Sequence, residues 1–258
     1  MSLLRCAAAL AFFLAAPAFA QTPAGESFTA EYDGAAYGVI ALGKAQVSAT
    51  ASDNRYDATG KLHTVGLAVL FGKAAADAAA TGRLADGVAS PSVYTLLHDY
   101  HGGIRHLRVE WGGPRVAITS DPPRDYHGDI PTTDAQQRDG RDPLSTMITL
   151  GAHVAATGRC AGSFRVFDGF YVYDLTMSDA GPPGRYRRGD IDLPVVRCTM
   201  RQKRVAGYAR RADLDKALPP ASIWFAILPD MPIAVLTRFS TGLPLGEATI
   251  SLTHLEQR

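Results

Sequence analysis

The sequence lacks the motifs by which most enzyme classes are identified. It contains no Gly-x-Ser-x-Gly, Ser-x-x-Lys or His-Glu-x-x-His motif, no glycine-rich phosphate loop and no EF-hand pattern. Asparagine occurs once, at Asn54, which argues against an Asn-based catalytic site. Charge of one sign is not in excess either, because 26 Lys and Arg residues stand against 25 Asp and Glu residues. Balanced charge gives no electrostatic case for nucleic acid or anionic lipid as a partner.

Long apolar runs are also scarce, with one exception at the N-terminus. A short segment with one Arg precedes an almost unbroken apolar run from Cys6 to Ala16, and Ala18-Phe19-Ala20 has the small-x-small pattern of a cleavage site. The run is too short to span a bilayer comfortably. Residues 1–20 are therefore predicted to be a cleaved signal peptide. The mature chain is expected to start at Gln21, to lie in the periplasm and to have no transmembrane segment.

Cysteine is rare as well, and its positions are informative. Cys6 leaves with the predicted signal peptide, so that only Cys160 and Cys198 remain in the mature chain. An even pair in an oxidising compartment predicts a structural disulfide. The alternative is a pair of free thiols with a redox role, but no Cys-x-x-Cys motif or neighbouring His supports it.

The rest of the chain reads mainly as β-structure in one domain. Residues 21–27 are small and polar and are expected to be a loose lead-in, and residues 28–258 are expected to form a single β-rich domain. Alternating apolar and polar residues from Phe28 onward, broken by turn signals such as Asp53-Asn54, are typical of an antiparallel meander. Residues 66–82 are ambiguous between a short helix and a strand of small residues. Residues 163–177 indicate a hairpin that turns at Asp168-Gly169.

Two segments differ from this strand pattern. Asp142-Pro143-Leu144 has an N-cap Asp followed by Pro at the first helical position, which predicts a helix that ends near Gly158. Residues 121–142 are rich in Pro, Asp, Gly and Arg, which indicates a long loop that could act as a lid. Their carboxylates could bind calcium, but interleaved Arg residues favour a neutralised, solvated loop.

Histidines give no predicted metal site. The cluster His98-Asp99-Tyr100-His101, with His106 and His127 further on, contains ligands for zinc or copper. On a strand, however, His98 and Tyr100 point to one face and Asp99 to the other. The spacing therefore does not preorganise a ligand set, so neither a metal nor another cofactor is expected.

Aromatic residues recur on nearly every predicted strand and are the remaining candidates for a binding site. Core packing and cross-strand pairing are their ordinary use. They could also line an apolar cavity in a curved sheet, which would suit a lipophilic or amphipathic ligand. The residues predicted to contact such a ligand are Tyr171, Tyr173, Trp224 and Phe225.

Several short motifs, in their order along the chain, resemble one protein family. These motifs are Tyr32 to Gly38, Tyr56-Asp57-Ala58-Thr59-Gly60, Asp142-Pro143-Leu144-Ser145, Phe164 to Gly169 followed by Tyr173-Asp174-Leu175, and Ala206-Gly207-Tyr208. They are similar to motifs of the exported bacterial domain-of-unknown-function family 3108, and the positions of Cys160 and Cys198 are similar to those of its proteobacterial members. The resemblance implies a periplasmic β domain related to the curved half-barrels of lipoprotein carriers. It supplies no catalytic residues.

The expected fold is therefore mainly β: a strongly curved antiparallel sheet, an open or half barrel, wrapped around one main helix with a few short helices. The preferred function is non-catalytic, either binding or maintenance of the cell envelope, with an amphipathic or lipophilic ligand in the concavity of the sheet. One alternative is a structural module that binds another envelope protein through a sheet face or edge. A third is a hydrolase that uses a His/Asp pair, with His98 or His127 beside a carboxylate.

Overall fold

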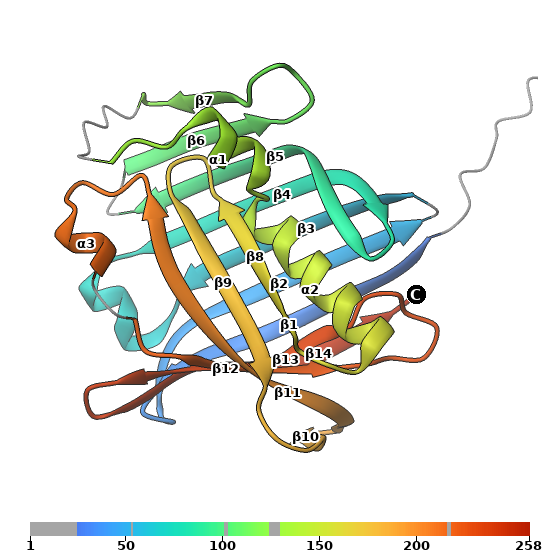
Figure 1. Cartoon of the computed structure of the whole chain (residues 1–258). Coiled ribbons are helices and arrows are strands. Elements are labelled where there is room, and N and C mark those ends of the chain that lie inside the picture. The colour runs from blue at the N-terminus through green and yellow to red at the C-terminus, as the bar shows by residue number, and fades with distance from the viewer. Residues whose placement is uncertain (1–24, 53, 101–102, 124–129, 216–217) are drawn as a thin grey trace, which may run out of the picture.

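The computed structural model of the chain describes residues 25–52, 54–100, 103–123, 130–215 and 218–258. These residues form one antiparallel sheet of 14 strands in the order β7-β6-β5-β4-β3-β2-β1-β14-β13-β12-β11-β9-β8, with β10 paired to β11. The two outer strands of this order, β7 and β8, are not hydrogen-bonded to each other, so the sheet curls without closing (Figure 1). The expected curved antiparallel sheet around one main helix is confirmed.

The strands are β1 (Glu26–Ala36), β2 (Ile40–Ser52), β3 (Arg55–Thr64), β4 (Ala74–Ala85), β5 (Val88–Tyr100), β6 (Gly103–Glu110), β7 (Ala117–Asp121), β8 (Gly162–Phe167), β9 (Val172–Asp179), β10 (Gly184–Arg188), β11 (Ile191–Ala206), β12 (Ala221–Ala226), β13 (Val235–Leu243) and β14 (Gly246–Gln257). The helices are the 3-10 helix η1 (Gly66–Phe71), α1 (Asp134–Asp139), α2 (Pro143–Thr157) and α3 (Ala212–Asp215). The predicted signal peptide lies outside the described residues.

Side-chain alternation sets the register of the first strands, as the sequence predicted. On β1 the residues Phe28, Ala30 and Tyr32 are buried, while the residues between them are more exposed. Their partners on β2 and β3, such as Ala49 and Ala58, face the same concave side. A slip by one residue would turn this whole set toward solvent, so the apolar pattern fixes the pairing.

Helix α2 begins and ends where the sequence predicts. The side chain of Asp142 accepts a hydrogen bond from the backbone N–H of Ser145, and Pro143 occupies the first turn. Gly158 ends the helix in the left-handed conformation, with φ of 67°, which glycine adopts without steric cost. Figure 1 shows α2 lying inside the curve of the sheet.

The structure resolves the ambiguity of residues 66–82 and corrects the interpretation of residues 121–142. The first segment divides into the helix η1 and the start of strand β4, because the alanines pair with β3 and β5. The second segment is not a continuous loop. Thr133 and Gln136 form a capping box at the start of α1, a local signal that the sequence reading missed. Residues 124–129 lie outside the described part of the chain.

The segment around α1 connects the two free edges of the sheet. Trp111, which follows β6, donates its indole N–H to the carbonyl of Gln137 at 3.2 Å. At the other end of the segment, Arg141 exchanges two backbone hydrogen bonds with β8, from its N–H to Arg165 and to its carbonyl from Phe167. Residues 130–141 therefore bridge the β6–β7 connection and strand β8, which is a structural role.

Helix α2 covers only one half of the concave face. Its first residues lie at the middle of the sheet, where a Cβ at Gly60 would come within 3.3 Å of Leu144. It ends toward the β4–β5 turn, where a Cβ at Gly87 would lie 3.8 Å from Ala152. The half of the sheet beyond Gly60, toward Thr64 on β3, is the half that α2 does not cover, and η1 lies against β2 at its end.

The N-terminus of α2 is held by a buried polar chain. Ser145 donates its hydroxyl to the Asp142 carboxylate, and its oxygen in turn accepts the hydroxyl of Tyr56 on β3. All three residues are at most 1% exposed. Burial raises the pKa of the Asp142 carboxyl above its ordinary value, while the hydrogen bonds from Ser145 oppose that rise. Each buried polar group has a partner, so this chain fixes the position of α2 without an unsatisfied group.

This arrangement predicts distinct effects for two substitutions of Asp142. Asp142→Ala removes the helix cap and should lower the free energy of unfolding by about 1–2 kcal/mol. Asp142→Asn keeps a capping oxygen and is neutral at every pH. Because the folded-state pKa of Asp142 is raised, protonation stabilises wild-type protein below the ordinary aspartate pKa, and this stabilisation is lost as pH rises through the raised value. The free energy of unfolding of Asp142→Asn, relative to that of wild type, should therefore be highest at neutral pH and lower in acid. Urea unfolding at several pH values measures this, and the opposite pH trend would contradict it.

The two remaining cysteines meet as predicted. Cys160, just after α2, and Cys198 on β11 form a disulfide with their Cα atoms 5.5 Å apart. Both are buried, in a cluster with Leu150 and Val154 of α2 and Met177 of β9. The bridge therefore links the end of α2 to the strands that form the second wall of the sheet.

We expect Cys160→Ser to lower the free energy of unfolding by roughly 2–4 kcal/mol, because the bridge closes a loop with a sequence separation of 38 residues. Denaturant titration of oxidised, reduced and Cys160→Ser protein measures this loss. Reduced wild type should match the variant. Two alkylatable thiols in protein purified without reductant would show that the bridge does not form.

Candidate ligand cavity

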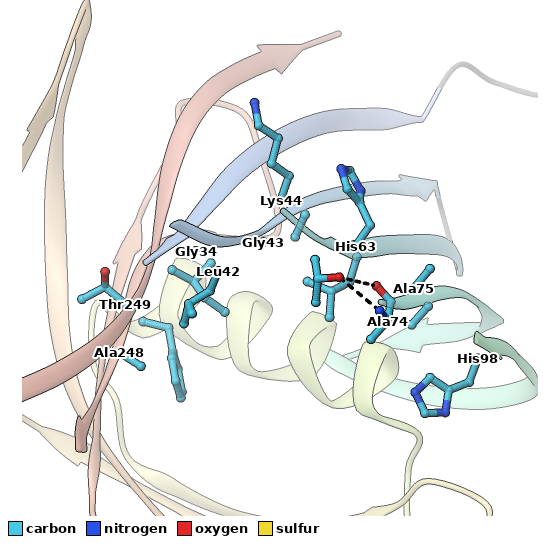
Figure 2. Close-up of a pocket in the computed structure, with 16 residues that line it drawn as sticks. Gly34, Leu42, Gly43, Lys44, His63, Ala74, Ala75, His98, Ala248 and Thr249 are labelled. Carbon is cyan, nitrogen blue, oxygen red and sulfur yellow. Dashed lines mark hydrogen bonds between the residues drawn. The ribbon is translucent and has the colours of Figure 1, made fainter. Parts of the chain in front are cut away.

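An apolar cavity of about 290 Å³ lies in the half of the sheet that α2 leaves uncovered. Strands from both sides of β1 form its wall: β2, β3, β4 and β5 on one side and β13 and β14 on the other. Figure 2 shows this arrangement, with the side chains of Lys44 and His63 directed away from the cavity. Its lining residues are Gly34, Leu42, Gly43, Lys44, Ala45, Leu62, His63, Thr64, Ala74, Ala75, Ala76, His98, Phe239, Ala248, Thr249 and Ile250.

The cavity exists because the inward positions near this end of the strands carry small side chains. Gly34 on β1 pairs with Gly43 on β2, and Ala45 and Ala76 follow at inward positions of β2 and β4. At the other end of the same strands, Phe28 and Tyr56 fill the space. Close packing normally leaves few voids in a core. A row of Gly and Ala without a covering helix therefore leaves a hollow.

The burial of side chains along β3 changes in the same direction, from the filled end of the strand to the end at the cavity. Tyr56 and Ala58 are at most 3% exposed, whereas Leu62, four residues further along the same face, is 50% exposed. Leu62 points to the concave side, so its exposed surface borders the cavity. An apolar side chain exposed at an inward position is an available contact for an apolar ligand.

The polar groups at the cavity are few. The hydroxyl of Thr64 is engaged with the backbone of Ala74, whose N–H it accepts at 3.1 Å (Figure 2). His98 lies at an inward position of β5 and borders the cavity, where Figure 2 places its ring beyond Ala74. The wall can therefore bind an apolar group by burial, and His98 is one of the polar side chains at its border.

None of the four predicted ligand residues lines this cavity. Trp224 and Phe225 are neighbours on β12 and point to opposite faces of the strand. Phe225 is 1% exposed and packs in the cluster that contains Leu150 and Val154 of α2. Trp224 lies on the other face, beneath the guanidinium of Arg238 at 5.6 Å.

Tyr171 and Tyr173 lie near the other wall of the sheet. The ring of Tyr171 stacks on Tyr208 with centroids 4.7 Å apart, and Arg204 lies over Tyr208. Burial and the nearby Asp168 carboxylate raise the pKa of Tyr173 above its ordinary value. The four aromatic residues are thus dispersed over the molecule, and their role in ligand binding stays a prediction.

The histidine cluster falls only in part within the described residues. His98 lies at the cavity, whereas His101 and His127 lie outside the described residues. Within the described ranges, no group of three or more His, Cys, Asp or Glu residues is close enough to hold a metal ion. Asp99, next to His98, has a buried carboxylate oxygen without a hydrogen-bond partner in the described structure.

Sequence reasoning expected a cavity in the concavity of the sheet but looked for its lining among four large aromatic residues, none of which is in the lining of this cavity. The signal was the opposite one, a run of small residues at inward strand positions. Ala74 to Ala80 stand in the segment that the sequence left ambiguous between a short helix and a strand of small residues. Small residues on a strand allow either a crowded contact or a hollow. Only the position of α2 decides between crowding and a cavity, and that position depends on contacts between distant segments.

Comparisons with known proteins support the fold and leave the function open. No protein-family model matches the chain, and no curated protein matches it. Among solved structures, the chain is similar to the "Beta-barrel-like Protein of Domain of Unknown Function DUF1849 from Brucella abortus", with a TM-score of 0.52. The similarity covers 90% of this chain and 98% of that chain at 10% sequence identity. In the described residues, no helix is long and apolar enough to cross a membrane. The chain therefore has a beta-barrel-like fold, shared with a protein of unknown function.

Proposed function

We propose that the protein binds the apolar part of an amphipathic molecule, such as an acyl chain, in the cavity between β1–β5 and β13–β14. The observation that carries this proposal is an apolar hollow of about 290 Å³, bordered by the half-exposed Leu62 at an inward position. The hollow is of a useful size, because an apolar cavity of about 150 Å³ already takes up benzene. Ligand sites in proteins are typically of this concave, mostly apolar kind.

Energetics favour a ligand with a medium-length apolar chain. Burial of eight methylene groups contributes roughly 6 kcal/mol, at about 0.8 kcal/mol for each group. Association costs several kcal/mol, so additional contacts of the polar end are needed for tight binding. His98 and the open border of the cavity give that end a place near water. A dissociation constant in the micromolar range is expected.

The setting of this function is part of the proposal. The apolar run and Ala18-Phe19-Ala20 support export to the periplasm, and the motif order supports kinship with the domain-of-unknown-function family 3108. A non-catalytic role in binding or maintenance at the cell envelope follows from these features together with the cavity.

Filling the cavity should abolish binding. Ala76→Phe places a ring at an inward position of β4, and we expect it to weaken binding of a dansyl-labelled undecanoic acid at least about tenfold. Ala79→Phe is the matched control, because Ala79 lies on the same strand but on the other face and does not line the cavity. Fluorescence titration gives the two affinities, and thermal unfolding checks that both variants fold.

Two results would overturn the proposal. One is failure of wild-type protein to bind the dansyl probe or unlabelled decanoic acid added as a competitor. The other is equal weakening by Ala76→Phe and Ala79→Phe, which would place the bound probe outside this cavity.

Export predicts a defined N-terminus. Protein recovered from the periplasm of a Gram-negative host should begin at Gln21, because cleavage after Ala20 fits the small-x-small pattern. Intact mass spectrometry measures this directly. A mass that retains residues 1–20, in protein found only in the cytoplasm, would contradict the prediction.

A further inference from the structure

The exposed apolar side chains of the protein are concentrated at one end of the sheet. The described structure leaves eight large apolar residues exposed, and six of them lie at the end where the cavity is found. These six are Tyr37, Val39, Leu62, Leu97, Ile104 and Leu245. Val39 and Leu245 are the most exposed, at 85% and 87%. Scattered exposed apolar residues are normal, but their gathering at one end is not.

Chain reversals form the outer tips of this end. Three of them, which we call the apolar tips, are Tyr37–Val39 between β1 and β2, residues 65–73 between β3 and β4, and Pro244-Leu245 between β13 and β14. Figure 1 shows these reversals on the side of the molecule away from the C-terminal end of α2. The first and third touch, because a Cβ at Gly246 would lie 2.8 Å from the ring of Tyr37.

Tyr37 occupies a backbone conformation that is costly for its residue type. Its φ is 52°, in the left-handed region, and Gly38 follows at 73°. Hairpin turns usually place Asn, Asp or Gly at such positions, since other residues lose about 1–2 kcal/mol there. The Tyr37 side chain covers Gly246 with part of its ring and is 44% exposed. This strain is consistent with a contact made elsewhere.

The opposite end of the same strands provides a comparison within the molecule. Its reversals carry the exposed polar or charged residues Asn54, Asp86, Arg115 and Asp230. The apolar tips contain one charged residue, Lys73, which is a cation. Two acids on the strands beside the first and third tips are opposed by arginines: Glu247 by Arg238 at 2.7 Å and Asp33 by Arg188 at 3.0 Å. The three tips therefore present apolar groups and no acidic side chain, which matches the chemistry of a lipid surface.

We propose that the apolar tips insert into the surface of a lipid bilayer, with the cavity facing the membrane so that an apolar ligand can pass between bilayer and protein. The transfer step rests on the proposed function, whereas membrane docking stands on the tips alone. Insertion does not require a large positive charge on the protein, because the transfer of apolar side chains such as Val39 and Leu245 out of water is itself favourable in free energy. Tyrosine suits the headgroup level, where one part of its ring is apolar and its hydroxyl stays wet.

Flotation of the whole mature protein with phosphatidylcholine vesicles tests this inference. Wild type should float with the vesicles, and the double variant Val39→Asp/Leu245→Asp should lower the bound fraction at least about tenfold. Val88→Asp is the matched control, because Val88 is 38% exposed at the opposite end. It should float as wild type does.

Ligand binding in solution separates the two proposals. The double variant should bind the dansyl-labelled acid as wild type does, while Ala76→Phe should float normally without binding it. Loss of flotation in Val88→Asp, or flotation of the double variant at wild-type level, would overturn membrane docking. So would a wild-type dimer in solution that Val39→Asp/Leu245→Asp dissociates, because a second copy would then cover the tips.

Discussion

The structure depends on the contact between the curved sheet and the single helix that enters it. The concave face of a sheet of this size must be covered by apolar groups. Helix α2 supplies such groups over only part of that face. Ile148 packs into the main core, while Leu150 and Val154 pack against the strands that carry Phe225 and Cys198. At Gly151 the fit is so close that the helix carbonyl accepts the backbone N–H of Ala234, and a Cβ there would lie 2.7 Å from that residue's oxygen. The helix can therefore neither shift nor roll to fill the rest of the concavity.

Polar contacts determine which half of the sheet is covered. Thr149 accepts the backbone N–H of Ala89, and Arg141 donates to the carbonyl of the same residue, both near the β4–β5 turn. Tyr56 reaches Ser145 at the helix start. Hydrogen bonds inside an apolar core are directional and costly to leave unmade. They hold α2 at the end away from the apolar tips, so the cavity is a consequence of how the helix is anchored.

Sequence patterns were sufficient for local structure and insufficient for the site. Alternation on β1 and β2, the Asp142-Pro143 helix start and the cysteine pair are local or compositional signals, and the structure has each of them. Helix α1, within residues 121–142, begins at the capping box of Thr133. This motif is visible in the sequence, but the Pro, Asp and Gly content of the segment indicated a loop instead. The cavity depends on Gly34, Gly43 and Ala76 meeting across strands, and on where α2 stops. Those are long-range contacts that periodicity does not encode, and the four aromatic residues predicted from the sequence do not line the cavity.

The central claim is that an apolar ligand occupies the uncovered half of the concave face. Nuclear magnetic resonance of methyl-labelled protein with ¹³C-labelled decanoic acid tests it most directly, because contacts between ligand and methyl groups report proximity. The account predicts contacts from the acyl chain to the methyl groups of Leu62, Ala45 and Ala76 at the cavity wall. Contacts to Leu150 and Val154 of α2 instead, or none to any methyl group at saturating ligand, would contradict it.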